Sequence, residues 1–250
     1  MIRMSMDNSQ ISNNTERSLV SNVQNLFSEL DGKTTLVAVT KKRSVEDIQN
    51  LFQMGVTHFG ENRVDEIYEK SSEVEKFSND TFHWHFIGHL QSNKIKKLLG
   101  VRRLSHIHSV DSLRLLINMY TEIEKVKDSI YAPLFFFLQV NTSGEKEKQG
   151  FVNYDEIKDV MNLIKEKESL DPGVKLRFRG LMTMSSIREQ DFESEAKKCF
   201  QRLTSWKINL SQDFQIPLEK IQLSMGMSDD YHLALDYNTD FVRIGRKLFR

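Results

Sequence analysis

The hydrophobic positions of this chain alternate between short apolar runs and longer segments with helical spacing. The short runs are rich in β-branched and aromatic residues, which predicts strands. In the segments between them, apolar residues recur every three or four positions, the spacing of one helix face. The eight strands are expected at residues 36–40, 57–61, 84–88, 107–110, 134–141, 176–182, 221–225 and 241–245.

The segments with helical spacing carry boundary signals. In VEDIQNLFQMG, which begins at Val45, the apolar repeat stops at Gly55, a residue type that commonly ends a helix. One more helix is expected before the first strand, from Glu16 to Leu30.

Strands that alternate with helices predict parallel βαβ units that wind in one direction. Eight such units in 250 residues predict an α/β fold, the (β/α)8 TIM barrel, with an additional N-terminal helix. An open doubly wound sheet is the alternative, but no GxGxxG motif follows the first strand. We expect a single domain over residues 1–250, in which residues 1–14 form a flexible N-terminal segment.

Composition excludes several classes of function. The 35 basic and 35 acidic residues cancel, which argues against a nucleic-acid-binding surface or a polybasic membrane anchor. The single cysteine, Cys199, excludes an intrachain disulfide and is typical of a reducing compartment. No segment has the roughly 18 apolar residues of a membrane span, and the N-terminus lacks an apolar signal-peptide core. A cytoplasmic location is therefore expected.

The candidate chemistry lies at the ends of the strands, because barrels place their sites at the carboxyl ends. The first strand, LVAVT, is followed by Lys41 and Lys42. A lysine that is partly desolvated near other cations has a lowered pKa, and its neutral amine forms a Schiff base with an aldehyde. Position alone leaves open which lysine points inward, and whether either one only extends its charge into water.

The last two strands end in glycine-containing turns, SMGMS (224–228) and RIGR (243–246). Successive backbone N–H groups in such turns, with serine hydroxyls beside them, bind phosphate. A reactive lysine at the first strand and a phosphate cradle at the last two together indicate an aldehyde that carries a phosphate. Pyridoxal 5′-phosphate fits this description.

Several motifs resemble, in order, the signatures of the pyridoxal phosphate homeostasis protein family. They are LVAVTKK, HFGENRVDE, WHFIGHLQSNK, QVNTSGEKEKQGF, RGLMTM, LSMGMSDD and VRIGRKLF, between Leu36 and Phe249. The resemblance implies a barrel of PLP fold type III, similar to the N-terminal domain of alanine racemase. It also implies binding of pyridoxal phosphate, a role in vitamin B6 balance and no established enzymatic activity.

The resemblance implies roles for individual residues. Lys41 matches the Schiff-base lysine, Asn62 the asparagine near the cofactor, and Arg243 the arginine that faces the pyridine nitrogen. Gly245 and Arg246 match positions whose backbone N–H groups meet the phosphate. The expected cofactor-binding set is Lys41, Asn62, Met184, Ser224, Met225, Gly226, Ser228, Arg243, Gly245 and Arg246.

Two departures from the family pattern leave the cofactor affinity open: Arg63 replaces a tyrosine, and Arg246 replaces a small residue or threonine. We expect no counterpart of the tyrosine-bearing second domain of alanine racemase. We therefore expect a carrier without catalytic residues that buffers the cofactor or delivers it to apo-enzymes. A PLP-dependent racemase or lyase of alanine racemase type is the main alternative. A sugar-phosphate aldolase is the other, with Glu61 as its carboxylate.

We expect a monomer that binds pyridoxal phosphate, and neither nucleic acid nor a membrane. A metal site is not expected, although His83 and His85 share one strand face. No cysteine or carboxylate lies near them with the usual ligand spacing. We instead expect His85 to be a hydrogen-bonding residue of the core.

Overall fold

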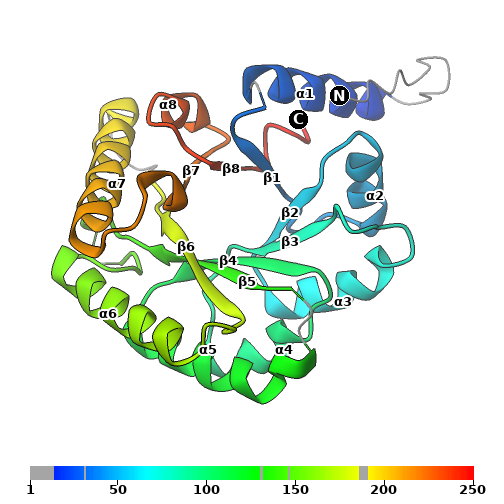
Figure 1. Ribbon diagram of the computed structural model, residues 1–250. Helices are drawn as coiled ribbons and strands as arrows, with labels where there is room; N and C mark the ends of the chain where they lie inside the picture. The colour runs from blue at the N-terminus through cyan, green and yellow to red at the C-terminus, as the bar shows by residue number, and fades with distance from the viewer. Residues whose placement is uncertain (1–13, 31, 130–131, 146, 186–190) are drawn as a thin grey trace.

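Eight parallel strands close into a barrel in the computed structural model of the chain (Figure 1). The structure describes residues 14–30, 32–129, 132–145, 147–185 and 191–250. Neighbouring strands pair in chain order, and β8 pairs with β1 to complete the ladder, which confirms the predicted fold class. The strands are β1 (Thr35–Val39), β2 (His58–Glu61), β3 (His83–Phe86), β4 (Leu104–Val110), β5 (Leu134–Gln139), β6 (Leu176–Met182), β7 (Gln222–Met227) and β8 (Phe241–Ile244).

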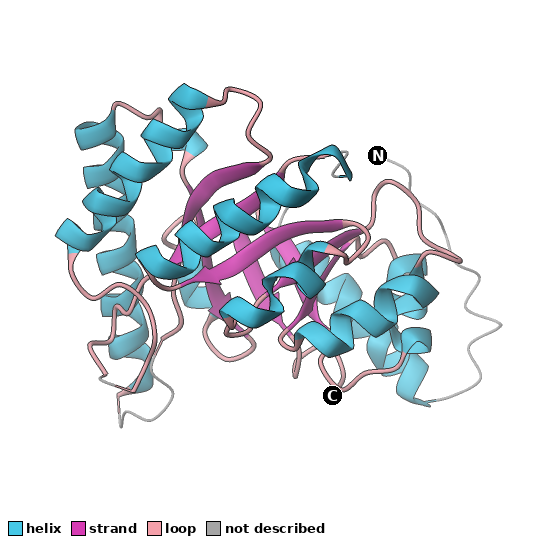
Figure 2. Ribbon diagram, turned by 90° about the horizontal axis from the view of Figure 1, so that it is seen from below, coloured by secondary structure: helices cyan, strands magenta, loops and turns pink. Residues whose placement is uncertain are grey.

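Helices surround the strands on the outside of the barrel (Figures 1 and 2). None of the helices in the described ranges combines the length and apolar character needed to cross a membrane. The α-helices are α1 (Asn14–Leu30), α2 (Val45–Gln53), α3 (Val64–Val74), α4 (Ile95–Leu99), α5 (Leu113–Val126), α6 (Tyr154–Leu170), α7 (Phe192–Phe214) and α8 (Tyr231–Leu235). The short 3-10 helices are η2 (Ser92–Lys94), η3 (Lys127–Ser129) and η4 (Leu218–Lys220).

The additional N-terminal helix expected from the sequence is α1, which lies beside the C-terminus of the chain (Figure 1). Asn22 donates from Nδ2 to the carbonyls of Leu248, at 3.0 Å, and Arg250, at 2.9 Å. Helix α1 therefore anchors the segment that follows β8. Of the N-terminal segment expected to be flexible, residues 1–13 lie outside the described residues, and Asn14 begins α1.

Helix α2 shows how local sequence sets an element's bounds. Ser44 and Asp47 form a capping box, in which each side chain accepts the backbone N–H of the other. Ile48 and Leu51 are buried on the inner face of the helix. Gly55 adopts a φ of 91° directly after the helix, a conformation that glycine reaches without a Cβ penalty. The predicted start and stop of this helix are confirmed.

The alternation of side chains along the strands divides the buried residues into two cores. Outward side chains such as Phe59 and Leu223 pack in the large core shared with the helices. The barrel interior contains the buried polar residues His85, His108 and Arg243, whereas barrel interiors are usually filled by branched aliphatic layers. The apolar cluster inside the barrel consists of Val37, Phe137, Met182 and Phe241.

A β-bulge in β6 changes which of its residues face inward. Phe136 pairs with Phe178 but Phe137 pairs with Gly180, so Arg179 is an extra residue on β6. At Gly180 the backbone lies so close to β7 that a Cβ would be 1.8 Å from the carbonyl oxygen of Gln222. Only glycine permits this approach.

We expect Gly180→Ala to destabilise the barrel strongly, because the added methyl group would collide with backbone atoms that cannot move independently. The free energy of unfolding should fall by about 3 kcal/mol, the upper end of the usual range for overpacking, as measured by urea denaturation. The control is Gly144→Ala, where a Cβ would meet no atom within 4 Å. There the positive φ of 74° alone should cost about 1 kcal/mol. Equal losses in the two variants would contradict the assigned role of Gly180.

Candidate functional site

The predicted site residues lie at the carboxyl ends of the strands, where the loops of one barrel face meet. Lys41 follows β1, Asn62 follows β2 and Met184 follows β6. Ser228 follows β7, and Gly245 follows β8. Residues more than 200 positions apart in the sequence therefore share one mouth.

Pairing of β1 with β8 brings the two ends of the predicted site together. Ala38 pairs with Ile244, so Lys41 and Gly245 follow on adjacent strands. A Cβ on Gly245 would lie 3.3 Å from both the Cβ and the carbonyl oxygen of Val39. The glycine thus lets the loop after β8 approach the strand that leads to Lys41.

Strand parity favours Lys41 over Lys42 as the residue directed toward the barrel axis. Val37 belongs to the interior cluster, and Lys41 lies on the same parity four residues later, in the turn that follows β1. Thr40, between the two, is fully buried on the helix side. Lys42 has a left-handed φ of 61°, and its N–H donates to a carboxylate of α3. The partial burial expected for the lysine is not found, because Lys41 is exposed.

A buried ion pair supports the end of β1 from the helix side. Lys70 on α3 donates from Nζ to the Thr40 carbonyl at 3.0 Å, and to the carboxylates of Glu61 and Glu66 at 2.8 Å each. Burial raises the pKa of Glu61, and the bond from Lys70 opposes that rise. Glu61 contacts α3 and lies away from the mouth, so it is not the carboxylate beside Lys41 that the aldolase alternative requires.

Arg243 places a buried positive charge inside the barrel, with 5% of its surface exposed. Its Nη1 donates to Ser224 Oγ at 2.5 Å, and its Nη2 donates to the Thr183 carbonyl at 2.8 Å. Burial lowers the pKa of Arg243 to about 10, so the guanidinium remains charged at neutral pH. A guanidinium has five N–H donors, so these two bonds leave donors for a ligand.

The loop after β8 presents successive backbone N–H groups. Ser228 Oγ accepts the N–H groups of Gly245 and Lys247, each at 3.3 Å. These bonds are longer than the usual 2.9–3.0 Å, so an anion with stronger acceptor oxygens would compete for the same donors. The exposed side chain of Arg246 forms an ion pair with Asp229. The group that Arg246 offers at the turn is therefore its backbone N–H.

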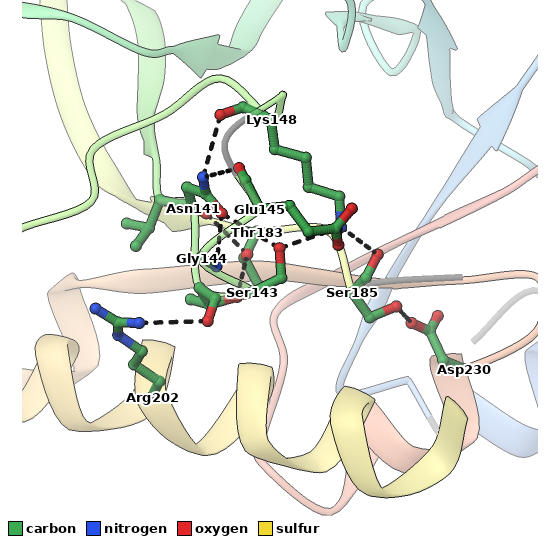
Figure 3. A network of polar contacts seen from close by, with 11 residues as sticks. Asn141, Ser143, Gly144, Glu145, Lys148, Thr183, Ser185, Arg202 and Asp230 are labelled. Carbon is green, nitrogen blue, oxygen red and sulfur yellow. Dashed lines mark hydrogen bonds and ion pairs between the residues drawn. The ribbon is translucent and has the colours of Figure 1, made fainter. Parts of the chain in front are cut away.

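A network of polar contacts connects the loops after β5, β6 and β7 (Figure 3). Asp230 accepts the N–H of Met227 at 2.6 Å and the hydroxyl of Ser185. Lys148 reaches from the loop after β5 to the Ser185 carbonyl, at 3.2 Å, and pairs with Glu145 at 2.7 Å. Lys148 and Glu145 thereby connect the loop after β5 to the end of β6, a connection that no local sequence signal indicates.

The remaining residues of the predicted set fall on both sides of the barrel wall. Ser224 is buried inside the barrel beside Arg243, and Met184 packs against the interior cluster. Met225 belongs to the outer core, so its side chain is directed away from the mouth. Gly226 has a φ of 95°, and a Cβ there would lie 2.8 Å from the Ala234 side chain.

Asn62 lies at the contact between the loops after β2 and β3. A Cβ on Gly88 would be 2.0 Å from the Asn62 carbonyl oxygen, so glycine is required for this approach. The Asn62 side chain is exposed at the mouth, and the neighbouring Arg63 is exposed as well. The arginine that replaces the family tyrosine therefore projects into solvent.

Below Arg243, a chain of hydrogen-bonded imidazoles crosses the barrel interior. His108 Nδ1 lies 2.8 Å from Ser224 Oγ, and His85 Nδ1 lies 2.8 Å from His108 Nε2. The chain continues to His58, whose Nδ1 lies 2.8 Å from His85 Nε2. We refer to Ser224, His108, His85 and His58 as the histidine chain. The hydrogen-bonding core role expected for His85 is confirmed, but alternating histidines on separate strands do not reveal their connection.

Burial keeps these imidazoles neutral. The pKa of His58 is lowered to about 4, and that of His106, which stacks on His85, to about 3. The pKa values of His85 and His108 lie well below the usual value, chiefly because burial disfavours the imidazolium. Within the described ranges, no group of three or more His, Cys, Asp or Glu side chains is arranged to hold a metal ion.

The fold and the residues at its mouth define a class of protein. The model of the alanine racemase N-terminal domain family matches residues 16–250, and the chain belongs to this family. Its relatives are more specific: the pyridoxal phosphate homeostasis protein of Schizosaccharomyces pombe is 38% identical over 214 residues, 86% of this chain and 82% of that protein. The mouse protein of the same name is 35% identical, over 86% of this chain and 75% of its own. The family resemblance found in the sequence is confirmed.

Solved structures show the same barrel. PipY of Synechococcus elongatus, solved without PLP, is 29% identical with a TM-score of 0.76, covering 93% of this chain and 100% of that one. PipY with PLP bound is 27% identical with a TM-score of 0.73 over the same shares. Alanine racemase of E. faecalis shares the fold at a TM-score of 0.68 and 16% identity, and this chain spans 57% of its length.

We expect stability to fall as the pH drops below about 6.5. The buried histidines have folded-state pKa values below the unfolded value, so the unfolded chain binds more protons in this range and unfolding is favoured. Each fully buried histidine should contribute about 1.4 kcal/mol per pH unit. Urea denaturation between pH 7.5 and 5 measures this slope.

The matched variants for this test are His106→Phe and His232→Gln. Phenylalanine keeps the stacking on His85 but removes an ionisable ring, so the slope should become shallower by about one histidine's share. His232 is exposed, and its replacement should leave the slope unchanged. An unchanged slope in His106→Phe would show that the buried imidazoles do not cause the acid sensitivity.

Proposed function

We propose that this protein holds pyridoxal 5′-phosphate on Lys41 in vitamin B6 homeostasis, and buffers or delivers the cofactor without robust turnover. The observation that carries the proposal is the contact of β1 with β8. This pairing brings the strand that leads to Lys41 beside the strand that carries the buried Arg243 and ends in a turn of backbone N–H groups. An aldehyde, a phosphate and a ring nitrogen are the matching groups of the cofactor.

Lys41 is the residue that binds the aldehyde. When the cofactor is bound, the amine of Lys41 would hold its aldehyde carbon covalently. Thr40 keeps the preceding backbone in place, because Lys70 bonds to its carbonyl and Glu61 accepts its hydroxyl. In an otherwise exposed lysine, this buried anchor limits the region of the mouth that the amine can reach.

The turn after β8 holds the phosphate in this proposal. The backbone N–H groups of Gly245 and Arg246 donate to its oxygens, and Ser228 adds a hydroxyl at the same place. Gly226 and Met225 contribute through backbone shape, because the Met225 side chain faces the helices. The anion also releases Ser228 from its two long bonds to backbone N–H groups.

Arg243 faces the pyridine nitrogen. A permanently charged donor beside this nitrogen leaves it unprotonated, which weakens the ring as an electron sink. Ser224 acts through Arg243, since the hydroxyl accepts one guanidinium N–H. Asn62 and Met184, which follow β2 and β6 at the same mouth, would hold the ring of the cofactor. A site of this kind retains the cofactor better than it promotes carbanion chemistry.

The relatives support this proposal. PipY has been solved with PLP bound, and the relatives of S. pombe and mouse are named for pyridoxal phosphate homeostasis. Racemisation requires two acid–base groups that flank the substrate Cα. Of the candidates considered from the sequence, Lys41 lies at the mouth and Glu61 is buried against α3. The protein then acts as a cytoplasmic monomer that passes the cofactor to PLP-dependent apo-enzymes.

Matched lysine variants test the site. The wild-type protein incubated with pyridoxal phosphate should show a visible absorbance band that borohydride removes, and peptide mass spectrometry should find the pyridoxyl group on Lys41. Lys41→Ala should abolish both signals. Lys42→Ala should retain them, because the left-handed φ of Lys42 turns the backbone out of the β1 strand and its N–H bonds to Glu66 on α3. A band that survives in Lys41→Ala would contradict the assignment.

Isotope exchange separates a carrier from an enzyme. The loaded protein should not exchange the Cα proton of alanine with deuterium from solvent at a rate above that of free pyridoxal phosphate, as followed by NMR. Exchange that depends on Lys41 would overturn the carrier proposal and favour a racemase or lyase.

A further inference from the structure

The histidine chain has two possible hydrogen-bond directions. A neutral imidazole has one N–H and one bare nitrogen, so three linked rings must all donate one way or all the other. In one direction Ser224 donates to His108, which donates to His85, which donates to His58. In the other, every bond is reversed and His108 donates to Ser224. The contacts at the upper end of the chain decide between them.

Arg243 settles the direction at Ser224. A guanidinium only donates, so Ser224 Oγ is an acceptor in its 2.5 Å bond to Arg243. If His108 also donated, the serine hydrogen would have no acceptor among the contacts of the described residues. Ser224 is fully buried, so water would not replace that acceptor. Donation from Ser224 to His108 satisfies every group.

Electrostatics favours the same direction. With Ser224 as donor, His108 and His85 each turn a bare Nδ1 toward the guanidinium and an Nε2–H away from it. The imidazole dipoles then align with their negative ends toward Arg243. The reverse direction would point N–H groups at a buried cation in a medium of low dielectric constant.

Stacking fixes the rings in these orientations. His85 stacks on His106 with centroids 4.4 Å apart, and His108 stacks on Phe137 at 4.6 Å. Each of the two rings uses both nitrogens in contacts of 2.8 Å. A ring flip would exchange nitrogens for carbons and lose both bonds of that ring, so the ring orientations are determined.

We propose that the histidine chain positions Arg243, and that the guanidinium holds His108, His85 and His58 in a single tautomer, protonated at Nε2. The chain serves as a neutral hydrogen-bonded counterpart to the buried cation, and the buried Asp230 attracts the guanidinium but forms no ion pair with it within the described residues. A carboxylate would hold the guanidinium in an ion pair and withdraw it from a ligand, whereas aligned neutral dipoles leave its remaining donors available. His108, His85 and His58 are thus positioning residues that reach the mouth only through Ser224 and Arg243.

The tautomers are measured directly on the full chain without added cofactor. Long-range 1H–15N correlation spectra of protein labelled with 15N-histidine distinguish Nε2–H, Nδ1–H and imidazolium rings. At pH 7.5 we expect His58, His85 and His108 to be Nε2–H. An Nδ1–H or imidazolium form at His85 or His108 would overturn the proposal.

Two variants test whether Arg243 and Ser224 cause the single tautomer of the histidine chain. Arg243→Met removes the cation but keeps a long side chain, and mixed tautomers should appear at His108 and His85. A spectrum that keeps all three rings as Nε2–H would show that Arg243 does not set the direction. Ser224→Ala should release His108 in the same way, whereas Ser109→Ala should not. Ser109 is a neighbouring buried serine whose hydroxyl bonds to the Gly88 carbonyl, outside the chain.

The effect on the site rests on the proposed function and is measured separately. Ser224→Ala should weaken pyridoxal phosphate binding about tenfold, the factor that corresponds to about 1.4 kcal/mol of lost hydrogen bonding. Ser109→Ala should leave the affinity unchanged. Equal affinities in Ser224→Ala and the wild type would overturn the positioning role. A wild type with the expected tautomers but no cofactor binding would refute the proposed function and leave the tautomer assignment standing.

Discussion

Closure of the parallel ladder is the constraint on which the rest of this structure depends. When β8 pairs with β1, every strand must present alternate side chains to the axis and to the helices. That alternation sends the side chain of Thr40 toward α3, and Lys41 follows at the carboxyl end of β1. It also places Arg243 inside the barrel, within reach of Ser224 on the neighbouring strand. An open sheet would leave the first and last strands at separate edges, and the elements of the site would not meet.

The interior of this barrel carries an electrostatic problem that aliphatic barrels do not have. Arg243 is buried, and a buried charge is tolerated only when polar groups replace its hydration. The replacement comes from a carbonyl, a hydroxyl and a line of neutral imidazoles that extends to the half-buried His58 at the start of β2. Aromatic stacking supports this line, with Phe241 close to four of the histidine rings. The barrel interior therefore contains less apolar packing than an aliphatic barrel and holds a fixed positive charge beneath the mouth.

In the proposed function, that fixed charge favours retention of the cofactor over catalysis. A protonated ring nitrogen strengthens PLP as an electron sink, and racemisation also requires acid–base groups on both faces of the substrate. The mouth described here combines an amine with N–H donors for an anion and a cation beneath, all suited to recognition. Lys148 and Asp230 tie the surrounding loops to the ends of β5, β6 and β7 (Figure 3), which favours a preformed site. Such a site is consistent with a protein that keeps a reactive aldehyde bound.

The sequence by itself determined the number, kind and order of the elements, because apolar spacing and helix caps such as Ser44 are local signals. It also identified a lysine and two glycine turns as candidate chemistry, since residue type and strand position suffice for that. The burial of Met225 and Glu61, and the different surroundings of Ser224, beside Arg243, and Ser228, at the turn after β8, were decided only by the tertiary structure. The sequence indicated a hydrogen-bonding core role for His85, but neither its partners His58 and His108 nor Lys70 gave a recognisable signal, because a lysine on an amphipathic helix and histidines on separate strands look like solvated or packing residues. Their bonds join segments far apart in the sequence, and only ring closure of the barrel sets the distances between them.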